Sequence, residues 1–231
     1  MSETNTIMSS KTSNDKKMII AMASIGIICA LLIVMTYEGT KSVIEKNKAE
    51  ALEKAVFQVI PGISKTKTFK LNPDQTLSEI SNNDPNTKKV YAGYDEGGKF
   101  KGVAFQGSGK GYGDLLSLLF GYDPEQQKIV GFYVLESKET PGIGDKIEKD
   151  PFLSNMKTID VAVSEDQTTL KNEIKTVKNG EKTNSWEIDA ITGATITSRA
   201  VGNIINKSGK EWIPTLYKNK KVFLSNDKTK K

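Results

Sequence analysis

Hydrophobic residues first gather in one uninterrupted run near the N-terminus. Residues 18–37 (MIIAMASIGIICALLIVMTY) carry no charged side chain, and their number is about what an α-helix needs to cross the hydrocarbon core of a membrane. A cleaved signal peptide is the alternative, but the run is long for its apolar region and no small-residue cleavage site follows before Glu38. We therefore predict a transmembrane helix over residues 18–37, preceded by a polar, disordered tail over residues 1–17.

A second apolar pattern continues beyond the predicted span. Hydrophobic residues recur from Val43 to Val59 at the spacing of one helix face. Pro61-Gly62 then ends the pattern, because proline and glycine commonly follow a helix C-terminus. We predict a helical connector over residues 38–62.

From residue 63 onward the apolar runs are short and separated by turn-rich segments. Residues 88–105 predict a hairpin, in which two runs flank Glu96-Gly97-Gly98. Strands and helices mix without a regular βαβ rhythm, which indicates the α+β class. We therefore predict one N-terminal transmembrane helix followed by a single mixed α/β domain over residues 63–217. Further strands are expected at residues 129–135, 159–163, 174–177 and 186–188, and short helices at residues 115–120 and after Asp150-Pro151.

The net charge of +5 has a local origin. Residues 218–231 hold six lysines against Asp227, which by itself gives +5 and leaves the remainder of the chain neutral in sum. A lysine-rich terminus is more often a solubilising tail than a binding arm. We predict a basic C-terminal tail over residues 218–231 and no nucleic-acid partner.

The sequence contains no histidine and a single cysteine, Cys29. The absence of histidine excludes imidazole bases, histidine-ligated haem and most catalytic zinc sites. One cysteine forms neither a disulfide nor an iron–sulfur cluster within the chain. We expect no metal site and no catalytic side chain, so any redox chemistry has to come from an organic cofactor.

Two glycine-containing segments are candidate ligand loops. Residues 107–113 lack the G-x-x-x-x-G-K-[ST] pattern and open no βαβ unit, so a mobile or tightly turned loop is favoured there. Glu139–Gly144 (ETPGIG) follows a predicted strand, and its Pro-Gly pair indicates a sharp turn. Amides beside Thr140 would bond the polar edge of a ring while Ile143 covers its face; the alternative is a plain strand-ending loop.

Hydroxyl side chains cluster around a Gly-Ala pair in Asp189–Thr197 (DAITGATIT). Apolar residues then recur at helical spacing, which places Thr195, Thr197 and Ser198 at a helix N-terminus. Free backbone N–H groups and the positive end of the helix dipole favour an anion there. Taken alone, the cluster is also explained by an ordinary helix N-cap.

These motifs resemble those of the FMN-binding domain family, which occurs in the G subunit of the Rnf ion-translocating electron-transport complex and in the C subunit of sodium-translocating NADH:quinone reductase. Asp189–Thr197 meets the family pattern D-x-x-[ST]-G-A-T-x-[ST], and Glu139–Gly144 meets E-T-P-G-[LI]-G. Gly109–Tyr112 is a looser match to a third stretch. The resemblance covers about residues 18–215.

The resemblance implies a covalently bound FMN. Thr197 occupies the acceptor position, so the cofactor phosphate would be esterified to its Oγ1 by a separate flavin transferase that uses FAD. By the same resemblance the flavin ring would be lined by Glu139, Thr140, Gly142 and Ile143, and its phosphate end would be held by Thr192, Gly193, Ala194, Thr195 and Ser198.

The expected function is an electron relay. By resemblance the chain is a membrane-anchored flavoprotein subunit of an Rnf-type ion-translocating oxidoreductase, a translocase with no complete activity in one chain, whose partners are the other subunits. It would lie in the cytoplasmic membrane as a single-pass protein, with the N-terminal tail inside and the domain on the outer face. The alternatives are the quinone-reductase C subunit, a non-covalent flavin-binding sensor module and a membrane-tethered scaffold.

Overall fold

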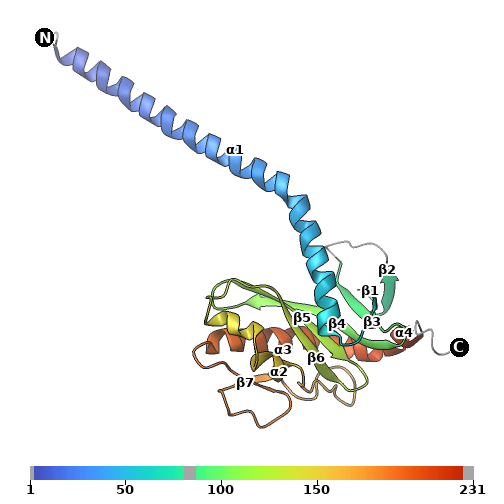
Figure 1. Ribbon diagram of the computed structural model, residues 1–231. Coiled ribbons are helices and arrows are strands. Elements are labelled where there is room, and N and C mark those ends of the chain that lie inside the picture. Colours follow the sequence, from blue (N-terminus) through green and yellow to red (C-terminus); the bar gives the residue numbers. More distant parts are fainter. Residues whose placement is uncertain (1–2, 81–86, 226–231) are drawn as a thin grey trace. The chain divides into compact units, whose positions relative to one another are not determined.

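The computed structural model describes residues 3–80 and 87–225, and side-chain environments from residue 15 onward. The chain divides into two compact units, one ending at Glu50 and the other beginning at Ala51. The first unit is made of helix α1 as far as Glu50, and the second contains the last turns of α1, the sheet and the remaining helices (Figure 1). The second unit therefore starts twelve residues before the predicted domain boundary, at residue 51 rather than 63.

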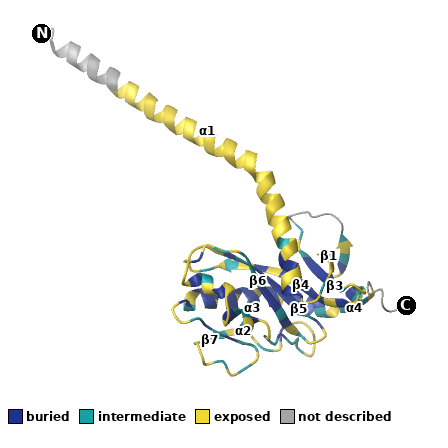
Figure 2. Cartoon of the chain, viewed as in Figure 1, coloured by how far each residue is buried: buried dark blue, intermediate teal, exposed yellow. Residues whose placement is uncertain are grey.

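Helix α1 runs from Glu3 to Val59. Among the described residues it is the one helix long and apolar enough to cross a membrane, and its side chains in the apolar run are exposed (Figure 2). Residues 3–17 are helical in the structure, whereas the sequence predicts a disordered tail there. The helix continues through this polar segment because no proline or glycine interrupts it. Residues 1–2 of that tail lie outside the described residues.

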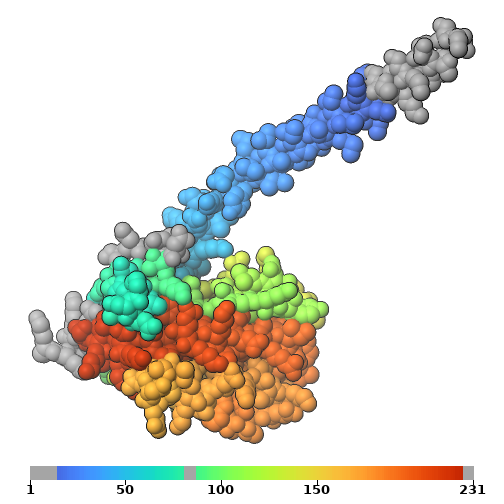
Figure 3. Space-filling view, turned by 180° about the vertical axis from the view of Figure 1, so that it is seen from behind, coloured from blue at the N-terminus to red at the C-terminus, as the bar shows by residue number. Residues whose placement is uncertain are grey.

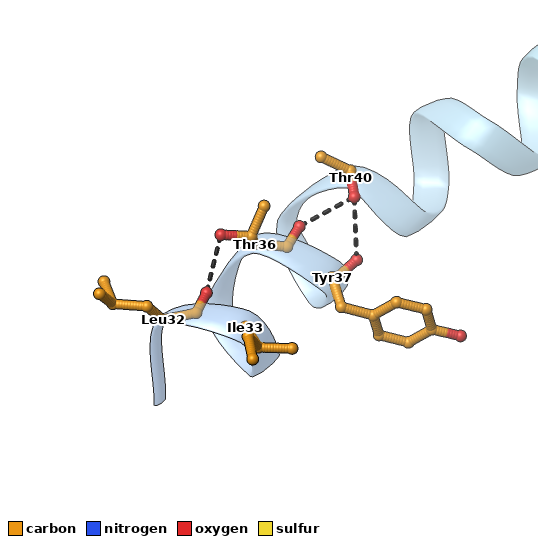
Figure 4. Close-up of a pocket in the computed structure, with 5 residues that line it drawn as sticks. All are labelled: Leu32, Ile33, Thr36, Tyr37 and Thr40. Carbon is orange, nitrogen blue, oxygen red and sulfur yellow. Dashed lines mark hydrogen bonds between the residues drawn. The ribbon is translucent and has the colours of Figure 1, made fainter. Parts of the chain in front are cut away.

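Two threonines near the end of the apolar run have their hydroxyls satisfied by the helix itself. Thr36 Oγ1 donates to the Leu32 carbonyl at 2.7 Å, and Thr40 Oγ1 donates to the Thr36 carbonyl at 2.8 Å (Figure 4). Such bonds leave no hydroxyl unpaired where water is scarce. Both threonines are thus compatible with a helix surrounded by lipid.

A six-stranded antiparallel sheet forms the centre of the second unit, in the order β2-β1-β3-β4-β5-β6. The predicted hairpin is confirmed as β3 and β4, and the predicted strand at residues 129–135 is confirmed as β6. The first two strands had no counterpart in the prediction. The strands are β1 (Lys65–Leu71), β2 (Leu77–Ile80), β3 (Lys89–Tyr94), β4 (Phe100–Lys110), β5 (Leu115–Asp123) and β6 (Lys128–Glu136).

Residues 115–120 belong to strand β5, so the short helix predicted there is wrong. The segment pairs with β4 on one side and β6 on the other, from Leu115 opposite Lys110 to Asp123 opposite Lys128. Central strands are buried on both faces, and a short continuous apolar run of this kind cannot be distinguished from a buried helix by periodicity. The glycine-rich stretch also differs from expectation, because β4 extends through it to Lys110.

The two faces of the sheet carry separate hydrophobic cores. On one face Val103 and Phe105 pack with helix α3 (Thr195–Lys218) in the larger core. On the other face Ala104 and Leu119 pack with the last turns of α1. Successive side chains of a strand point to opposite faces, so neighbouring residues of β4 serve different cores. Figure 3, which views the molecule from behind, shows α3 as a red-orange band. The band runs between the strands and the segment that precedes α3 in the chain.

The end of α1 lies against the sheet at two glycines. A Cβ added to Gly121 or to Gly131 would lie 2.0 Å from the Val59 carbonyl oxygen. No real Cβ tolerates that distance, and the obstacle is backbone, so any side chain here has to push the helix end away. Glycine at these positions is therefore required by the close approach of α1.

We expect Gly131→Ala to destabilise the domain by about 1–3 kcal/mol, as for other overpacked sites. For a chain of this size each kcal/mol lowers the melting temperature by roughly 2–4 °C. Gly39→Ala is the matched control, because nothing lies within 4 Å of its Cβ position, and it should leave the domain's melting temperature unchanged. Equal melting temperatures for the two variants would contradict this packing.

Shorter elements complete the second unit. The predicted helix after Asp150-Pro151 is confirmed as α2 (Phe152–Met156), which follows the 3₁₀ helix η1 (Gly144–Glu148). β7 (Lys175–Val177) and β8 (Glu187–Asp189) confirm two predicted strands and pair in parallel. Residues 159–163 form only isolated bridges, so the strand predicted there is wrong.

The C-terminal segment belongs to the core as far as it is described. α4 (Lys220–Ser225) buries Phe223, whose ring stacks on Phe100 with centroids 5.3 Å apart and meets Phe69 edge-on at 5.1 Å. The sequence predicts a basic tail from residue 218, but residues 220–225 form a helix. Burial of the Phe223 ring stabilises this segment despite the lysines around it. Residues 226–231 lie outside the described residues.

Candidate functional site

Two of the motifs singled out from the sequence meet at one hydrogen bond. Thr197 Oγ1, in the first turn of α3, donates to Glu139 Oε2 at 2.7 Å. Thr197 is 3% exposed and Glu139 is 8% exposed. The bond therefore joins two buried polar side chains that are 58 residues apart in sequence.

The other carboxylate oxygen of Glu139 is held by the turn between β4 and β5. The Tyr112 and Gly113 amides donate to Glu139 Oε1 at 2.8 and 3.3 Å. The turn is closed by the Gly111 amide, which donates to the Asp114 carbonyl at 2.8 Å. The carboxylate is thus bound by backbone donors on one side and by Thr197 on the other, which offsets the cost of burying it.

Glycines make room for this carboxylate. A Cβ on Gly111 would lie 2.1 Å from Glu139 Oε1, and a Cβ on Gly144 would lie 2.8 Å from Glu139 Oε2 and 3.2 Å from Thr197 Oγ1. Larger residues at either position would displace Glu139 or close the space beside the hydroxyl. The glycine-rich stretch before β5 and the last glycine of ETPGIG thus serve the same side chain.

The first turn of α3 offers backbone donors. The helix begins at Thr195 with Ala194 as its N-cap residue and no capping side chain. Among the described residues the amides of Thr195, Ile196 and Thr197 have no hydrogen-bond partner, so the interpretation of the cluster as an ordinary side-chain N-cap is wrong. Free N–H groups at a helix N-terminus bind phosphate or other anions.

The other hydroxyl and glycine residues of Asp189–Ser198 (DAITGATITS) lie in different environments. Ser198 is fully buried; its Oγ accepts from the Ile191 amide at 3.0 Å and donates to the Ala194 carbonyl at 2.9 Å. Thr192 and Gly193 are exposed, and Gly193 has a φ of +85°, which favours glycine. Ser198 therefore braces the turn from inside, while Thr192 and Gly193 lie at the surface.

Asp189, the first residue of the motif, supports the loop before it. Its Oδ1 accepts from the Gly180 and Lys182 amides, each at 3.1 Å. Nearby, the Thr183 and Asn184 amides donate to the Glu187 carboxylate and lower its pKa to about 2. These carboxylates fix the approach of β8 to the turn before α3.

The predicted ring-lining residues other than Glu139 lie at the surface. Thr140 is exposed, and its carbonyl accepts from the Ile143 and Gly144 amides at 3.1 and 2.9 Å. Gly142 is exposed with a φ of +78°. Ile143 is 49% exposed. The loop therefore presents a tight turn with an apolar side chain beside the buried Glu139–Thr197 pair.

Large apolar side chains are exposed in the segments that hold this pair. Within the second unit, outside α1, the exposed large hydrophobic residues among those described are Tyr112 (63%), Leu115 (52%), Ile143 (49%) and Ile196 (58%). They come from the three segments that meet at Thr197. Exposed apolar groups around a few polar ones are typical of ligand sites. Of these four, only Ile143 was assigned as a ligand contact from the sequence, because a single exposed hydrophobic residue has no signature in the apolar pattern; Tyr112 was included only in the looser family match at Gly109–Tyr112.

An FMN molecule has the chemistry that these groups fit. Its phosphate suits the free amides of the first turn of α3, and its flat aromatic ring suits the exposed apolar side chains. The positive-φ glycines at residues 142 and 193 have nothing within 4 Å of a Cβ position, which leaves space on the solvent side of the site. Among the described residues no group of three or more acidic or cysteine side chains could hold a metal ion.

Comparison with known proteins agrees with this chemistry. Residues 111–209 match the FMN-binding domain family. The matched range begins at the turn that holds Glu139 and extends into α3, so it contains both motifs.

The chain is also similar to proteins named as G subunits of ion-translocating oxidoreductase complexes. The chain is 27% identical over 192 residues to the G subunit of the ion-translocating oxidoreductase complex of Methanosarcina acetivorans, with 83% of this chain and 91% of that protein covered. It is 30% identical over 192 residues to the G subunit of the Na(+)-translocating ferredoxin:NAD(+) oxidoreductase complex of Acetobacterium woodii, with 80% and 84% covered. Among solved structures, the C subunit of Na(+)-translocating NADH-quinone reductase from Parabacteroides distasonis has a similar fold, with a TM-score of 0.52, 21% identity and 67% and 78% covered.

Proposed function

Because the chain belongs to the family of G subunits of ion-translocating oxidoreductase complexes, we propose that it carries FMN and relays electrons within such a membrane-bound complex. The observation that supports this most strongly is that the Glu139–Thr197 hydrogen bond lies at the start of α3 with its free amides, on segments that also expose large apolar side chains. The relatives bear out the predicted Rnf-type assignment. The quinone-reductase C subunit shares the fold.

The finer part of the proposal is a covalent link through Thr197. Its hydroxyl lies at the N-terminal turn of α3 beside the unpaired amides, whereas the Ser198 hydroxyl is already engaged inside the turn. A phosphoester at Thr197 Oγ1 would place the FMN phosphate where the helix dipole stabilises an anion. Bound FMN supplies the ability to accept and donate electrons, and the protein supplies its attachment and surroundings.

Each part of the site has a role in this proposal. The amides of Thr195 and Ile196 hold the phosphate, and Ser198 braces the turn that presents them. The loop at Thr140, Gly142 and Ile143 lines the ring. We propose that Thr192, Gly193 and Ala194 contribute to the phosphate end, with the exposed glycine allowing close approach of the ligand.

Helix α1 indicates how the site is located relative to the membrane. The chain is a single-pass membrane protein with one candidate span among the described residues, in the apolar helix Asp15–Val59, and its partners are the other subunits of the complex. We propose that residues 18–37 are the part that crosses the membrane. We propose that the N-terminal tail is on the inside and the FMN domain on the outer face, where a flavin transferase using FAD matures it. Protease digestion of a C-terminal tag on intact spheroplasts tests the orientation, since only an outer domain would be cut.

A mass measurement of the native chain tests the proposed cofactor. The chain purified from its own membranes should be heavier than its sequence by one FMN phosphoester and should fluoresce after denaturing electrophoresis. The same chain made in a host without a flavin transferase should show neither property. An unmodified mass for the native chain would overturn the covalent link, and release of the flavin on denaturation would indicate a non-covalent module instead.

A further inference from the structure

We infer that Glu139 is the general base of covalent attachment, which removes the proton of the Thr197 hydroxyl; this role rests on the proposed function. Both side chains are buried in apo protein, and the carboxylate accepts a hydrogen bond from the hydroxyl. A place in the lining of the flavin ring does not explain why the carboxylate is directed at the acceptor oxygen.

The hydroxyl of Thr197 and the carboxylate of Glu139 are placed as nucleophile and base. Thr197 Oγ1 donates to Glu139 Oε2 at 2.7 Å, and among the described residues it has no other hydrogen-bond partner. A general base has to lie within about 2.6–3.2 Å of the atom whose proton it removes. A neutral hydroxyl is a weak nucleophile, and an adjacent base is the usual means of activating it. The distance therefore meets the geometric requirement for proton removal.

The carboxylate is held in this position from its other side. The Tyr112 and Gly113 amides donate to Oε1 at 2.8 and 3.3 Å and leave Oε2 to the hydroxyl. The backbone is fixed as well, because the Glu139 amide donates to Ser137 Oγ at 3.2 Å. A nucleophile, a base and a third group that orients the base make up the arrangement typical of activated hydroxyls. Glu139 is thus oriented for proton removal before any ligand binds.

A purely structural hydrogen bond is the alternative, since buried polar groups are normally paired. The neighbouring hydroxyl shows how this turn satisfies such a group with neutral partners, because Ser198 Oγ bonds only the Ile191 amide and the Ala194 carbonyl. Burial of a carboxylate is far more costly than use of a backbone carbonyl. The chain also contains no histidine, the side chain that most often serves as a base. A charged partner reserved for Thr197 therefore favours the catalytic role.

The step moves one proton and no electrons. As Thr197 Oγ1 bonds to the phosphorus on the riboflavin side of the FAD pyrophosphate, the bond from that phosphorus to the bridging oxygen breaks, and AMP leaves. The hydroxyl proton moves to Glu139 Oε2 and from there to solvent. Protein kinases use an aspartate in the same way, to accept the proton of the attacking hydroxyl. The phosphate joined to Thr197 stays beside the free amides of Thr195 and Ile196, which stabilise its charge.

Attachment kinetics of the full-length chain test this role. Purified apo chain is mixed with a flavin transferase and FAD, and intact mass records the modified fraction over time. Glu139→Gln should attach flavin about 10²–10⁴-fold more slowly than the wild type, the usual contribution of a general base. Glutamine has the shape of glutamate and still accepts from the amides of the turn, but its amide takes up no proton. The melting temperature of the variant verifies that it is folded.

Chemical rescue separates proton removal from a structural role. Glu139→Ala leaves space where the carboxylate lay, and added formate should raise its rate of attachment severalfold, because formate supplies a small carboxylate base. Chloride at the same ionic strength should leave the rate low. A slow Glu139→Ala chain that formate and chloride affect equally would overturn the role and leave Glu139 as a structural residue only.

Glu136→Gln is the matched control. It changes an exposed glutamate three residues earlier in the same segment, and it should attach flavin at the wild-type rate. Attachment through Thr197 in the wild type, with an unchanged rate in Glu139→Gln, would overturn this role alone. A native wild-type chain without covalent flavin would overturn the covalent link of the proposed function, and this role with it.

Discussion

Thr197→Val is expected to abolish covalent flavin in a chain produced together with a flavin transferase. Valine has nearly the shape of threonine but no hydroxyl, so no ester can form, while the surrounding packing is kept. The loss should be complete by intact mass and by fluorescence after denaturing electrophoresis. Apo protein should also lose some stability, about 1–3 kcal/mol, because Glu139 Oε2 loses the donor that binds it at 2.7 Å in a buried site.

The controls for this prediction are neighbouring hydroxyls. Thr192→Val and Thr195→Val remove hydroxyls that are exposed and half-buried, respectively, and both variants should still acquire the flavin. Thr197→Ser keeps an acceptor oxygen and should also be modified. A Thr197→Val chain that retains its fluorescence under denaturing conditions would show that the acceptor is another residue.

A chain that starts at residue 63 is expected to aggregate, although it contains the whole predicted domain. The last turns of α1 and the residue after it bury Ala55, Val56, Val59 and Ile60 to 1% exposure or less, against the sheet face that carries Leu119. Each large aliphatic side chain buried in this way contributes about 1.5–3 kcal/mol. Losing three of them is comparable with the whole stability margin of about 5–15 kcal/mol of an ordinary domain.

Size-exclusion chromatography of two truncated chains measures this effect. A chain starting at residue 51, where the second compact unit begins, should be soluble and monomeric and should unfold in one transition. The chain starting at residue 63 should elute as aggregate or be insoluble. Equal solubility and equal melting temperatures for the two chains would mean that the end of α1 is not needed by the domain.

Local patterns predicted the elements on which the site depends. The hairpin at residues 88–105 and the start of α3 at Thr195 are confirmed, because turn glycines and helical spacing are encoded by adjacent residues. The end of α1 before Pro61-Gly62 is confirmed for the same reason. The two motifs also lie together as their resemblance to one family implies, at the bond between Glu139 and Thr197.

Features set by contacts between distant residues could not be predicted in this way. Residues 115–120 form a strand because two other strands flank them, and Phe223 is buried because Phe69 and Phe100 offer it a place. Neither fact is visible in the local sequence. The sequence marked Glu139 as a ring contact, but its burial behind Gly111 and Gly144 depends on three separate segments.

Covalent attachment of FMN by the proposed route would change the structure of the protein as well as its absorption spectrum. Esterification replaces the hydrogen of the Thr197 hydroxyl by phosphorus, and that hydrogen is the one that binds Glu139 Oε2. The bare and the loaded chain cannot share this bond. The junction between the ETPGIG loop and α3 must therefore be rebuilt when the cofactor arrives, so the apo protein is an imperfect template for the finished electron carrier.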